Sequence, residues 1–559
     1  MPKSDLRIDI LGTELTISTD EEKEYLENLL EKYRQTIENV RQRTGLKDPL
    51  KTAVLTGFLL CDDLEKAGSL KGSDRGETRE ETKNEDQGEA ETLTLRMISR
   101  LEEILVTPSE LPIIGTDNNL SVPMQSIFKL QNTVKNYKWG SAEWIPALLG
   151  EKNFSRVPWA ELWMGVNPAG PSRLKPLDGT AGKTISKEPH ASALSELPKL
   201  SDLIEGDKNA FLGEEIANEY GTLPFLFKVI AAARPLSIQA HPSLEQAREG
   251  FMRENEAGIP LDSPERNYKN PNHKPEIICA LNSFAALCGF RKTEEIGFLF
   301  EILSQESEGQ LKAGFEKLNH AISALKEQEE TSNPYSAFIS ALFNMEAEVL
   351  KEMALFFKTQ KAVLERDFPE YGDEWNLCSY FSGLSEVNPG DPGILAPLYL
   401  NIIELAPGQA MCLPAGVLHA YIQGMGIELM ADSDNVLRGG LTSKHINVDE
   451  LKKILAYREY KPEILRAPDP SIPLYSFPSP SIEFALSVIN GAAGEVSYAE
   501  AGPSILIITS GGADITVMGE EENQEVYLET GESVFIPPQK NLTFKGNFTA
   551  YAATAGKRL

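Results

Sequence analysis

Four potential metal ligands lie in three short segments that are far apart in the chain, and any fold of this sequence must bring them together. Gln239 and His241 stand two residues apart in Ser-Ile-Gln-Ala-His-Pro, a spacing that places both side chains on one face of a strand. Glu276 ends His-Lys-Pro-Glu, and His419 lies in Leu-His-Ala-Tyr. Two imidazoles, a carboxylate and an amide suit zinc and leave room for water or a substrate oxygen. The pattern therefore predicts a catalytic rather than a structural metal site.

A weak internal repeat indicates that these segments belong to β-barrels. Gly408, Pro414 and His419 are spaced as in the second motif of cupin barrels, in which a turn and a strand carry the histidine into the barrel mouth. The same turn spacing ends at Pro537 near the C-terminus, but the position that matches His419 is Leu542. We therefore expect a second barrel that has lost its metal and serves as a packing partner.

The changing composition along the 559 residues divides the chain into several parts. Aromatic-rich strands and turns begin near residue 128, helical periodicity covers the region from 289 to about 380, and strand character returns at 398. The predicted fold class is mainly β: double cupin (jelly-roll) barrels with an inserted α-helical domain, preceded by a small α/β N-terminal domain with long helices. The predicted domains are an α/β head at 1–106 with a disordered insertion at 68–91, a linker at 107–123, a catalytic cupin domain at 124–290 and 385–459, a helical insertion at 291–384, and a degenerate cupin domain at 460–559.

Charge and cysteine usage limit the partners of the chain. The formal net charge of −29 argues against binding to nucleic acid or to an anionic membrane surface. The longest uncharged apolar run, 53–61, is too short to span a bilayer. The five cysteines form no CxxC pair, which favours reduced thiols in a cytoplasmic protein. A few local cations could still bind a sugar phosphate, whatever the net charge.

The segments that carry the metal ligands are part of a longer series of family motifs. Residues 131–559 resemble type I mannose-6-phosphate isomerases, also called phosphomannose isomerases. The matching segments, in chain order, are Asn136-Tyr-Lys-Trp-Gly140, Ala160-Glu-Leu-Trp-Met-Gly165, Leu223-Pro-Phe-Leu-Phe-Lys228, Ser237-Ile-Gln-Ala-His-Pro242, Asn272-His-Lys-Pro-Glu276, Ala286-Leu-Cys-Gly-Phe-Arg291, Leu413-Pro-Ala-Gly-Val-Leu-His-Ala-Tyr421 and Ser433-Asp-Asn-Val-Leu-Arg438.

The resemblance implies a reaction and a set of site residues. It implies an isomerase that interconverts mannose 6-phosphate and fructose 6-phosphate through a cis-enediol(ate), feeding GDP-mannose synthesis or mannose catabolism. One zinc ion per catalytic domain is expected on Gln239, His241, Glu276 and His419, and Arg438 is expected to stabilise developing negative charge. The other expected catalytic residues are His273, Lys274, Asp434 and Glu428, and the expected substrate-binding residues are Lys228, Ser237, Lys444 and Tyr421.

Several roles stay open among these residues. His273, Lys274 and Glu428 all have the chemistry of a general base, and the sequence does not choose between them. Asp434 could orient a substrate hydroxyl or Arg438, or could cap a turn. Two other functions compete with this isomerase: a non-enzymatic scaffold with a sugar- or metal-binding cupin domain, and an isomerase of another sugar phosphate.

The first hundred residues carry a separate set of cues: Ile8-Asp-Ile-Leu-Gly12 at a predicted strand and turn, a predicted helix over 21–43, and Asp48-Pro49 at the start of another helix. With these cues they resemble a different family, the cell-division protein ZapA, which binds the FtsZ ring. The resemblance implies self-association into a homodimer or higher oligomer, binding to FtsZ and enrichment at the division site. The alternative is a generic α/β dimerisation module.

Overall fold

The chain divides into two compact units, residues 1–120 and 121–559. The computed structural model describes residues 4–10, 13–19, 33, 36–37, 127–176, 197–323, 333–384, 390–469, 471–519 and 523–556. In the first unit, β1 (Ser4–Ile10) and β2 (Thr13–Thr19) pair in antiparallel register from Ser4–Thr19 to Ile10–Thr13. The strand predicted at the start of the head is therefore confirmed. The predicted long helices, the 68–91 insertion and the 107–123 linker lie outside the described residues, apart from positions 33, 36 and 37.

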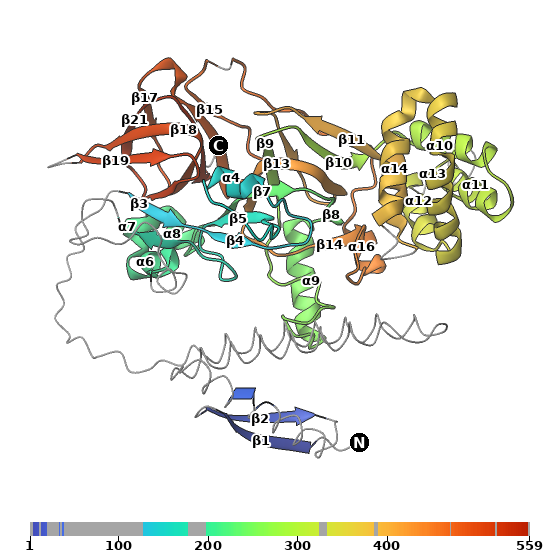
Figure 1. Cartoon of the computed structure of the whole chain (residues 1–559), viewed down its shortest axis with the longest axis horizontal. Helices are drawn as coiled ribbons and strands as arrows, with labels where there is room; N and C mark the ends of the chain where they lie inside the picture. Colours follow the sequence, from blue (N-terminus) through green and yellow to red (C-terminus); the bar gives the residue numbers. More distant parts are fainter. Residues whose placement is uncertain are drawn as a thin grey trace. The chain divides into compact units, whose positions relative to one another are not determined.

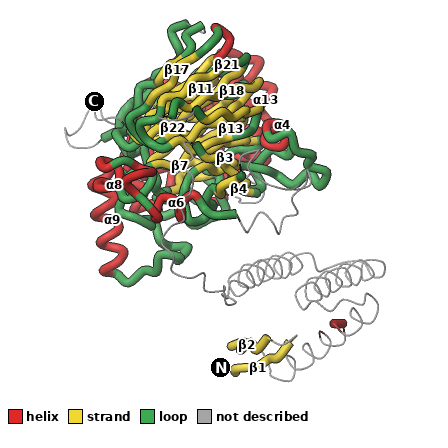
Figure 2. The backbone as a smooth tube through the Cα atoms, turned by 90° about the vertical axis from the view of Figure 1, so that its left-hand side faces the viewer, coloured by secondary structure: helices red, strands yellow, loops and turns green. Residues whose placement is uncertain are grey.

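The second unit contains two ten-stranded antiparallel sheets, and the first of these carries the predicted metal ligands. Its strands are β4 (Thr133–Lys135), β5 (Glu161–Met164), β7 (Phe225–Ala232), β8 (Ile238–Ala240), β9 (Glu276–Ala280), β10 (Phe284–Phe290), β11 (Leu400–Leu405), β12 (Ala410–Leu413), β13 (His419–Ala431) and β14 (Leu437–Gly440). The long strand β13 pairs with β7, β8, β9 and β10 along its length. It thereby brings segments that are more than 120 residues away in the sequence into one sheet. Figure 2 shows β13 and β7 among the other strands.

The second sheet combines C-terminal strands with two strands from the start of the unit. Its members are β3 (Phe128–Gln131), β6 (Arg173–Lys175), β15 (Leu474–Ser476), β16 (Phe484–Asn490), β17 (Val496–Ala499), β18 (Ser504–Val517), β19 (Gln524–Glu529), β20 (Ser533–Ile536), β21 (Asn541–Lys545) and β22 (Phe548–Ala555). Strand β3 pairs with β20, and β6 pairs with β3, so residues 460–559 do not build this sheet alone. Leu542, at the position equivalent to His419, is buried in an apolar cluster of this sheet. The domain boundaries within this unit stay predictions.

Between β10 and β11, the described residues form a group of helices. They are α10 (Thr293–Gln305), α11 (Gly309–Ser323), α12 (Pro334–Phe343), α13 (Ala347–Asp367) and α14 (Gly372–Leu384), followed by the short α15 (Ala396–Tyr399) that leads into β11. Figure 1 shows the five longer helices together beside β10 and β11. Their position in the sequence agrees with the helical periodicity from 289 to about 380.

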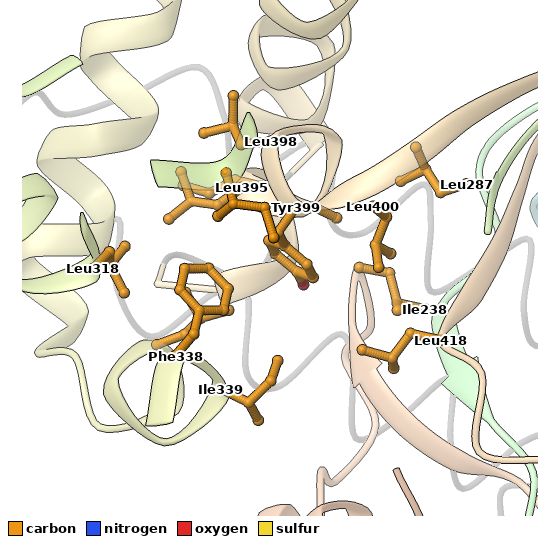
Figure 3. Close-up of a cluster of buried hydrophobic side chains, with 14 of the residues drawn as sticks. Ile238, Leu287, Leu318, Phe338, Ile339, Leu395, Leu398, Tyr399, Leu400 and Leu418 are labelled. Atoms are coloured by element: carbon orange, nitrogen blue, oxygen red, sulfur yellow. The ribbon is translucent and has the colours of Figure 1, made fainter. Parts of the chain in front are cut away.

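A shared apolar core joins the helical group to the first sheet. Figure 3 shows Tyr399 between Phe338 of α12 and the side chains of Ile238 and Leu418. The rings of Phe338 and Tyr399 are 5.4 Å apart between centroids. Ile238 and Leu418 are each the immediate neighbour of a predicted metal ligand, Gln239 and His419. Burial of these apolar side chains stabilises the fold by about 1.5–3 kcal/mol each and fixes the strand ends that carry the ligands.

The remaining helices lie between or after strands, and one of them helps to position a ligand. They are α4 (Trp144–Leu148), α6 (Leu200–Gly206), α7 (Lys208–Leu212), α8 (Glu214–Glu219), α9 (Leu244–Glu256), α16 (Val448–Ile454) and the 3₁₀ turns Pro369–Tyr371, Pro392–Leu395 and Gly491–Ala493. Helix α9 begins with a capping box between Ser243 and Gln246, which fixes the chain just after His241. Among the described helices, none has the length and apolar character needed to cross a membrane.

Candidate metal centre

Three side chains of the first sheet converge on one buried point. The Nε2 atom of His241 is 3.4 Å from Oε1 of Glu276, and the Nε2 atom of His419 is 3.5 Å from Oε2 of the same carboxylate. Each side chain is only 1% exposed. One ligand atom from each residue lies within 4.8 Å of the others, so together they could hold a metal ion.

The hydrogen bonding of these three residues fits a cation between them. His241 Nε2, His419 Nε2 and Glu276 Oε2 are buried and have no hydrogen-bond partner among the described residues. Buried polar atoms without partners cost free energy, and they are rare in native proteins. A cation bound between two nitrogens and a carboxylate oxygen would satisfy all three atoms at once, and this donor set is one that zinc accepts.

The backbone fixes both imidazoles with the same nitrogen facing inward. His241 Nδ1 donates to the carbonyl oxygen of Asn435 at 2.9 Å, and His419 Nδ1 donates to the carbonyl oxygen of Val417 at 2.9 Å. A carbonyl oxygen can only accept, so the proton of each neutral ring lies on Nδ1 and the lone pair on Nε2. Burial and the nearby charge of Lys274 lower the pKa of His241 to about 4, so the ring is neutral at neutral pH.

Lys274 provides the positive charge next to the carboxylate of this cluster. Its Nζ is 2.9 Å from Oε1 of Glu276, and the lysine side chain is 9% exposed. Although burial alone would raise the pKa of Glu276, Lys274 and the two imidazoles hold it well below its usual value. The carboxylate is therefore ionised and available to a metal ion.

Gln239 and Arg438 lie in register with His419. Gln239 on β8 is the pairing partner of His419 on one side and of Arg438 on the other. Directly opposed residues of antiparallel strands point to the same face, so these three side chains share the face that carries His241. Burial lowers the pKa of the half-buried Arg438, and the described residues provide no hydrogen bond or ion pair for its guanidinium group. This arrangement puts Arg438 on the sheet face that carries the metal ligands, with a guanidinium group that could receive a negatively charged group.

A second buried group of charges lies on β5, β7 and β13. Lys228 Nζ is 2.9 Å from Oε2 of Glu428 and 4.0 Å from Oε1 of Glu161. Tyr421 donates its hydroxyl proton to Oε1 of Glu428 at 3.0 Å, and Trp163 donates from Nε1 to Glu161 at 2.6 Å. Although burial alone would lower the pKa of Lys228, the two carboxylates raise it, so the lysine is charged. The Lys228 ammonium and both oxygens of Glu428 are thus already engaged.

His273, the third candidate for the general base, is directed toward the second sheet. Its Nε2 is 2.7 Å from Oε1 of Glu483, which directly precedes β16. The histidine side chain is 24% exposed, and its Nδ1 has no partner among the described residues. The structure therefore places His273 in the segment that leads into Glu276, but bonds it to a residue outside the metal cluster.

The candidates for binding the phosphate lie nearer the surface. Lys444 is exposed, and partial burial together with the charges of Arg438 and Lys269 lowers its pKa. Ser237 is half-buried just before β8, and Asp434 is exposed between β13 and β14. In a chain with a net charge of −29, Lys444 thus lies close enough to two other cations, Arg438 and Lys269, for their charges to lower its pKa.

Sequence reasoning missed some of the residues that complete these groups. Glu161 and Trp163 lie inside the motif Ala160-Glu-Leu-Trp-Met-Gly165, so the motif was a usable signal for them. Asn435 lies in the motif that carries Arg438, and its carbonyl orients His241. No sequence motif indicated Glu483 or Lys269. Glu483 matters through its contact with His273, and Lys269 through its charge near Lys444, and both partners are distant in the sequence.

Comparisons with known proteins agree with the residues assembled in this site. The family model "Phosphomannose isomerase type I, catalytic domain" matches residues 127–293, and the model "Cell division protein ZapA" matches residues 6–104. The mannose-6-phosphate isomerase of Salmonella typhimurium is 39% identical over 410 residues, which cover 73% of this chain and 94% of the relative. That of Escherichia coli is 37% identical over 422 residues, covering 75% and 97%. That of Homo sapiens is 31% identical over 442 residues, covering 75% and 95%.

Solved structures give the same result. A zinc-bound holo form of mannose 6-phosphate isomerase matches with a TM-score of 0.63 and 36% identity, covering 78% of this chain and 100% of the solved chain. The apo form from Salmonella typhimurium matches with a TM-score of 0.64 and 35% identity over the same shares. The similarity extends over nearly the whole length of each relative, and residues 6–104 match the ZapA model in addition. The chain therefore belongs to the type I phosphomannose isomerase family.

Proposed function

We propose that this protein is a zinc-dependent isomerase that interconverts D-mannose 6-phosphate and D-fructose 6-phosphate. The observation that carries the proposal is the convergence of three buried ligand atoms without hydrogen-bond partners, beside the guanidinium group of Arg438. The zinc-bound state of solved relatives and the names of relatives matched along 94–97% of their length point to the same chemistry.

The metal site we propose comprises Gln239, His241, Glu276 and His419 and holds one zinc ion per catalytic domain. A zinc ion bound there would supply a positive field that polarises substrate oxygens. Gln239 is included because it is paired in register with His419, which supports an amide on the same face. Lys274, bound to Glu276, adds a second positive charge next to the site.

Aldose–ketose isomerisation moves a proton between C1 and C2 through a cis-enediol(ate), and this step needs a base and a field that stabilises the oxyanion. We assign the field in part to Arg438, whose group has no competing partner among the described residues. We assign the base to His273, because Lys274 is ion-paired and both oxygens of Glu428 accept hydrogen bonds. A positioned base adds about 10²–10⁴-fold to the rate. Asp434 is proposed to orient a substrate hydroxyl at the exposed rim.

For the phosphate group we propose Lys444 and Ser237, together with the neighbouring charge of Arg438. Lysines suit phosphate as compact point charges, and Lys444 is exposed beside the other cations. Lys228 and Tyr421 are the less favoured candidates, because both are buried and their polar groups are bound to Glu428. We propose that these two residues instead hold the buried carboxylate of Glu428 in place.

The assay that tests this function follows fructose 6-phosphate formation from mannose 6-phosphate, with unphosphorylated mannose and glucose 6-phosphate as alternative substrates. We expect turnover of mannose 6-phosphate only. Lys444→Met should raise KM at least tenfold, whereas Lys461→Met, which changes another exposed lysine, should leave KM unchanged. Turnover of glucose 6-phosphate at the same rate would contradict the substrate assignment. Zinc-loaded, folded protein without turnover would favour the scaffold function.

At the level of architecture, we propose that each ten-stranded sheet closes into a cupin barrel, the first with the metal and the second without it. The pairing of β13 with four other strands and the burial of Leu542 in an apolar cluster support this assignment. We retain the domain division into 124–290 with 385–459, the helical insertion 291–384 and the C-terminal domain 460–559, and propose that strands β3 and β6 complete the second barrel.

For the ZapA domain we propose self-association into a homodimer or higher oligomer, binding to FtsZ and a cytoplasmic location with enrichment at the division site. The match of residues 6–104 supports this proposal. Mannose 6-phosphate made there would serve GDP-mannose synthesis, and the reverse reaction would serve mannose catabolism. Co-sedimentation with FtsZ filaments tests the binding, and the chain lacking residues 1–106 is the control. Equal sedimentation of both chains, or diffuse fluorescence of a tagged protein in dividing cells, would contradict it.

A further inference from the structure

A carboxylate directly before a strand of the second sheet reaches a candidate catalytic residue in the segment that leads into the first. Glu483 Oε1 lies 2.7 Å from Nε2 of His273, and the two side chains are 15% and 24% exposed. The residues are 210 positions apart in the sequence. The contact therefore connects the C-terminal sheet to the segment that ends in the ligand Glu276.

Glu483 is held firmly from its own side of this contact. The backbone N–H of Gly556, at the end of β22, donates to the carbonyl oxygen of Glu483 at 2.9 Å. The hydroxyl of Ser481 donates to Oε2, which leaves Oε1 for the histidine. Although burial alone would raise the pKa of Glu483, the hydrogen bonds from His273 and Ser481 lower it to about 2. At neutral pH, His273 therefore meets an ionised carboxylate at a fixed position.

The backbone around His273 is held from the other side. The carbonyl oxygen of Asn272 accepts hydrogen bonds from Ser433 Oγ at 3.0 Å and from Asn435 Nδ2 at 2.8 Å. The next residue, Lys274, is bound to Glu276. Rotation of the His273 side chain is then the main remaining freedom, and the bond to Glu483 removes it. The Nε2–H group of His273 faces the carboxylate, so Nδ1 is the nitrogen that can accept a proton.

We infer that Glu483 is a positioning residue for the isomerisation, through which the second sheet sets the orientation and tautomer of His273. This inference rests on the proposed function. With Nε2–H donated to Glu483, the lone pair on Nδ1 accepts the proton that leaves C2 of the aldose, while the C2–H electron pair forms the enediol(ate). The imidazolium that results is stabilised by Glu483, and the same proton returns to C1. The second sheet thus takes part in catalysis through one side chain.

The test uses the full-length, zinc-loaded protein and the mannose 6-phosphate assay. Glu483→Gln preserves the size of the side chain and removes its charge, and we expect kcat to fall by about 10–100-fold with KM and zinc content unchanged. Glu483→Asp should recover part of this loss. In a His273→Ala background, Glu483→Gln should lower kcat no further, because the two residues act as one unit. The control is Glu495→Gln, which removes a carboxylate paired with the exposed Lys545 at 3.0 Å and should leave kcat unchanged.

Each contrary outcome identifies a different error. A kcat of Glu483→Gln within twofold of the wild type overturns the inference and leaves the proposed function intact. An equal loss of kcat in the His273→Ala background, or a loss that accompanies release of zinc, shows that Glu483 acts through the fold and also overturns it. Each variant is assayed well below its own melting midpoint, which separates unfolding from lost chemistry. A wild-type protein without turnover removes the proposed function and this inference with it.

Discussion

Replacing Lys228 with methionine removes the only cation that contacts Glu428 among the described residues, at nearly constant side-chain volume. Lys228 and Glu428 are 7% and 5% exposed and 2.9 Å apart, and Glu161 lies 4.0 Å from the same ammonium group. The variant would keep two buried carboxylates and lose the charge that compensates them. Breaking a buried pair in this way costs about 3–5 kcal/mol. With a slope of about 3 kcal/mol per M of urea, the unfolding midpoint would fall by roughly 1–1.7 M.

The loss of stability in Lys228→Met depends on pH because Glu428 can still take up a proton. Burial already raises the pKa of Glu428, and Lys228 is the main group that opposes this increase. Without Lys228 the folded-state pKa would rise further above that of the unfolded chain. The penalty is therefore smallest near pH 5, where Glu428 can take up a proton, and grows as the pH rises toward 7.5. The double variant Lys228→Met/Glu428→Leu should be more stable than Lys228→Met alone at pH 7.5.

Urea unfolding followed by tryptophan fluorescence is the assay, because Trp163 is bound to Glu161 within this group. Arg156→Met is the matched control, since Arg156 and Glu143 are 3.1 Å apart but 76% and 72% exposed. We expect this surface change to cost less than about 1 kcal/mol. Equal midpoints for Lys228→Met and Arg156→Met, or a double variant less stable than Lys228→Met, would refute the reasoning.

Other parts of the molecule lead to further predictions. His241→Ala should release the metal, so its zinc content should be near zero after dialysis. In thermal unfolding, zinc at 100 times its dissociation constant should stabilise the wild type by about 2.7 kcal/mol. The same stabilisation of the variant would contradict the assignment of His241 as a metal ligand. Because the pKa of Glu483 is lowered to about 2, its stabilising contribution is present above about pH 4.5 and lost as the pH falls toward 2. Allowing for partial solvent exposure, Glu483 contributes about 1–2 kcal/mol to the free energy of unfolding. The Glu483→Gln variant should not show this loss of stability when the pH falls from 4.5 toward 2. Residues 121–559 alone should keep the kcat of the full chain, since relatives of about that length match this part, and a large loss would show that the ZapA domain contributes to catalysis.

The sequence predicted the parts of the site that short spacing and family motifs encode. The two-residue interval between Gln239 and His241 fixed their shared face, and the motifs around Glu276 and His419 marked the other ligands. The structure brings Glu276 and the two histidines together because β13 pairs with both β8 and β9. Leu542, at the position that matches His419, is buried in an apolar cluster, and the loss of a metal from this second barrel stays a prediction.

Long-range contacts set the limit of prediction from the sequence. Lys228 and Glu428 are 200 residues apart, and their pairing follows from the register of β7 and β13, which no local pattern reveals. The same holds for Glu483, whose bond to His273 requires the second sheet to be in place. Strands β3 and β6 lie within the range 124–290 predicted for the catalytic domain, and their hydrogen bonds join the second sheet, which no local pattern indicates.

We expect one zinc ion at His241, Glu276 and His419 to enable the isomerisation. The most direct test of this claim measures mannose 6-phosphate turnover by the full-length protein before chelation, after chelation and after zinc is added back, with Glu276→Gln treated in parallel. We predict that turnover disappears on chelation and returns with one equivalent of zinc in the wild type, and that it is not restored in the variant. Turnover that persists in metal-free protein, or a Glu276→Gln variant that zinc restores fully, would contradict the claim.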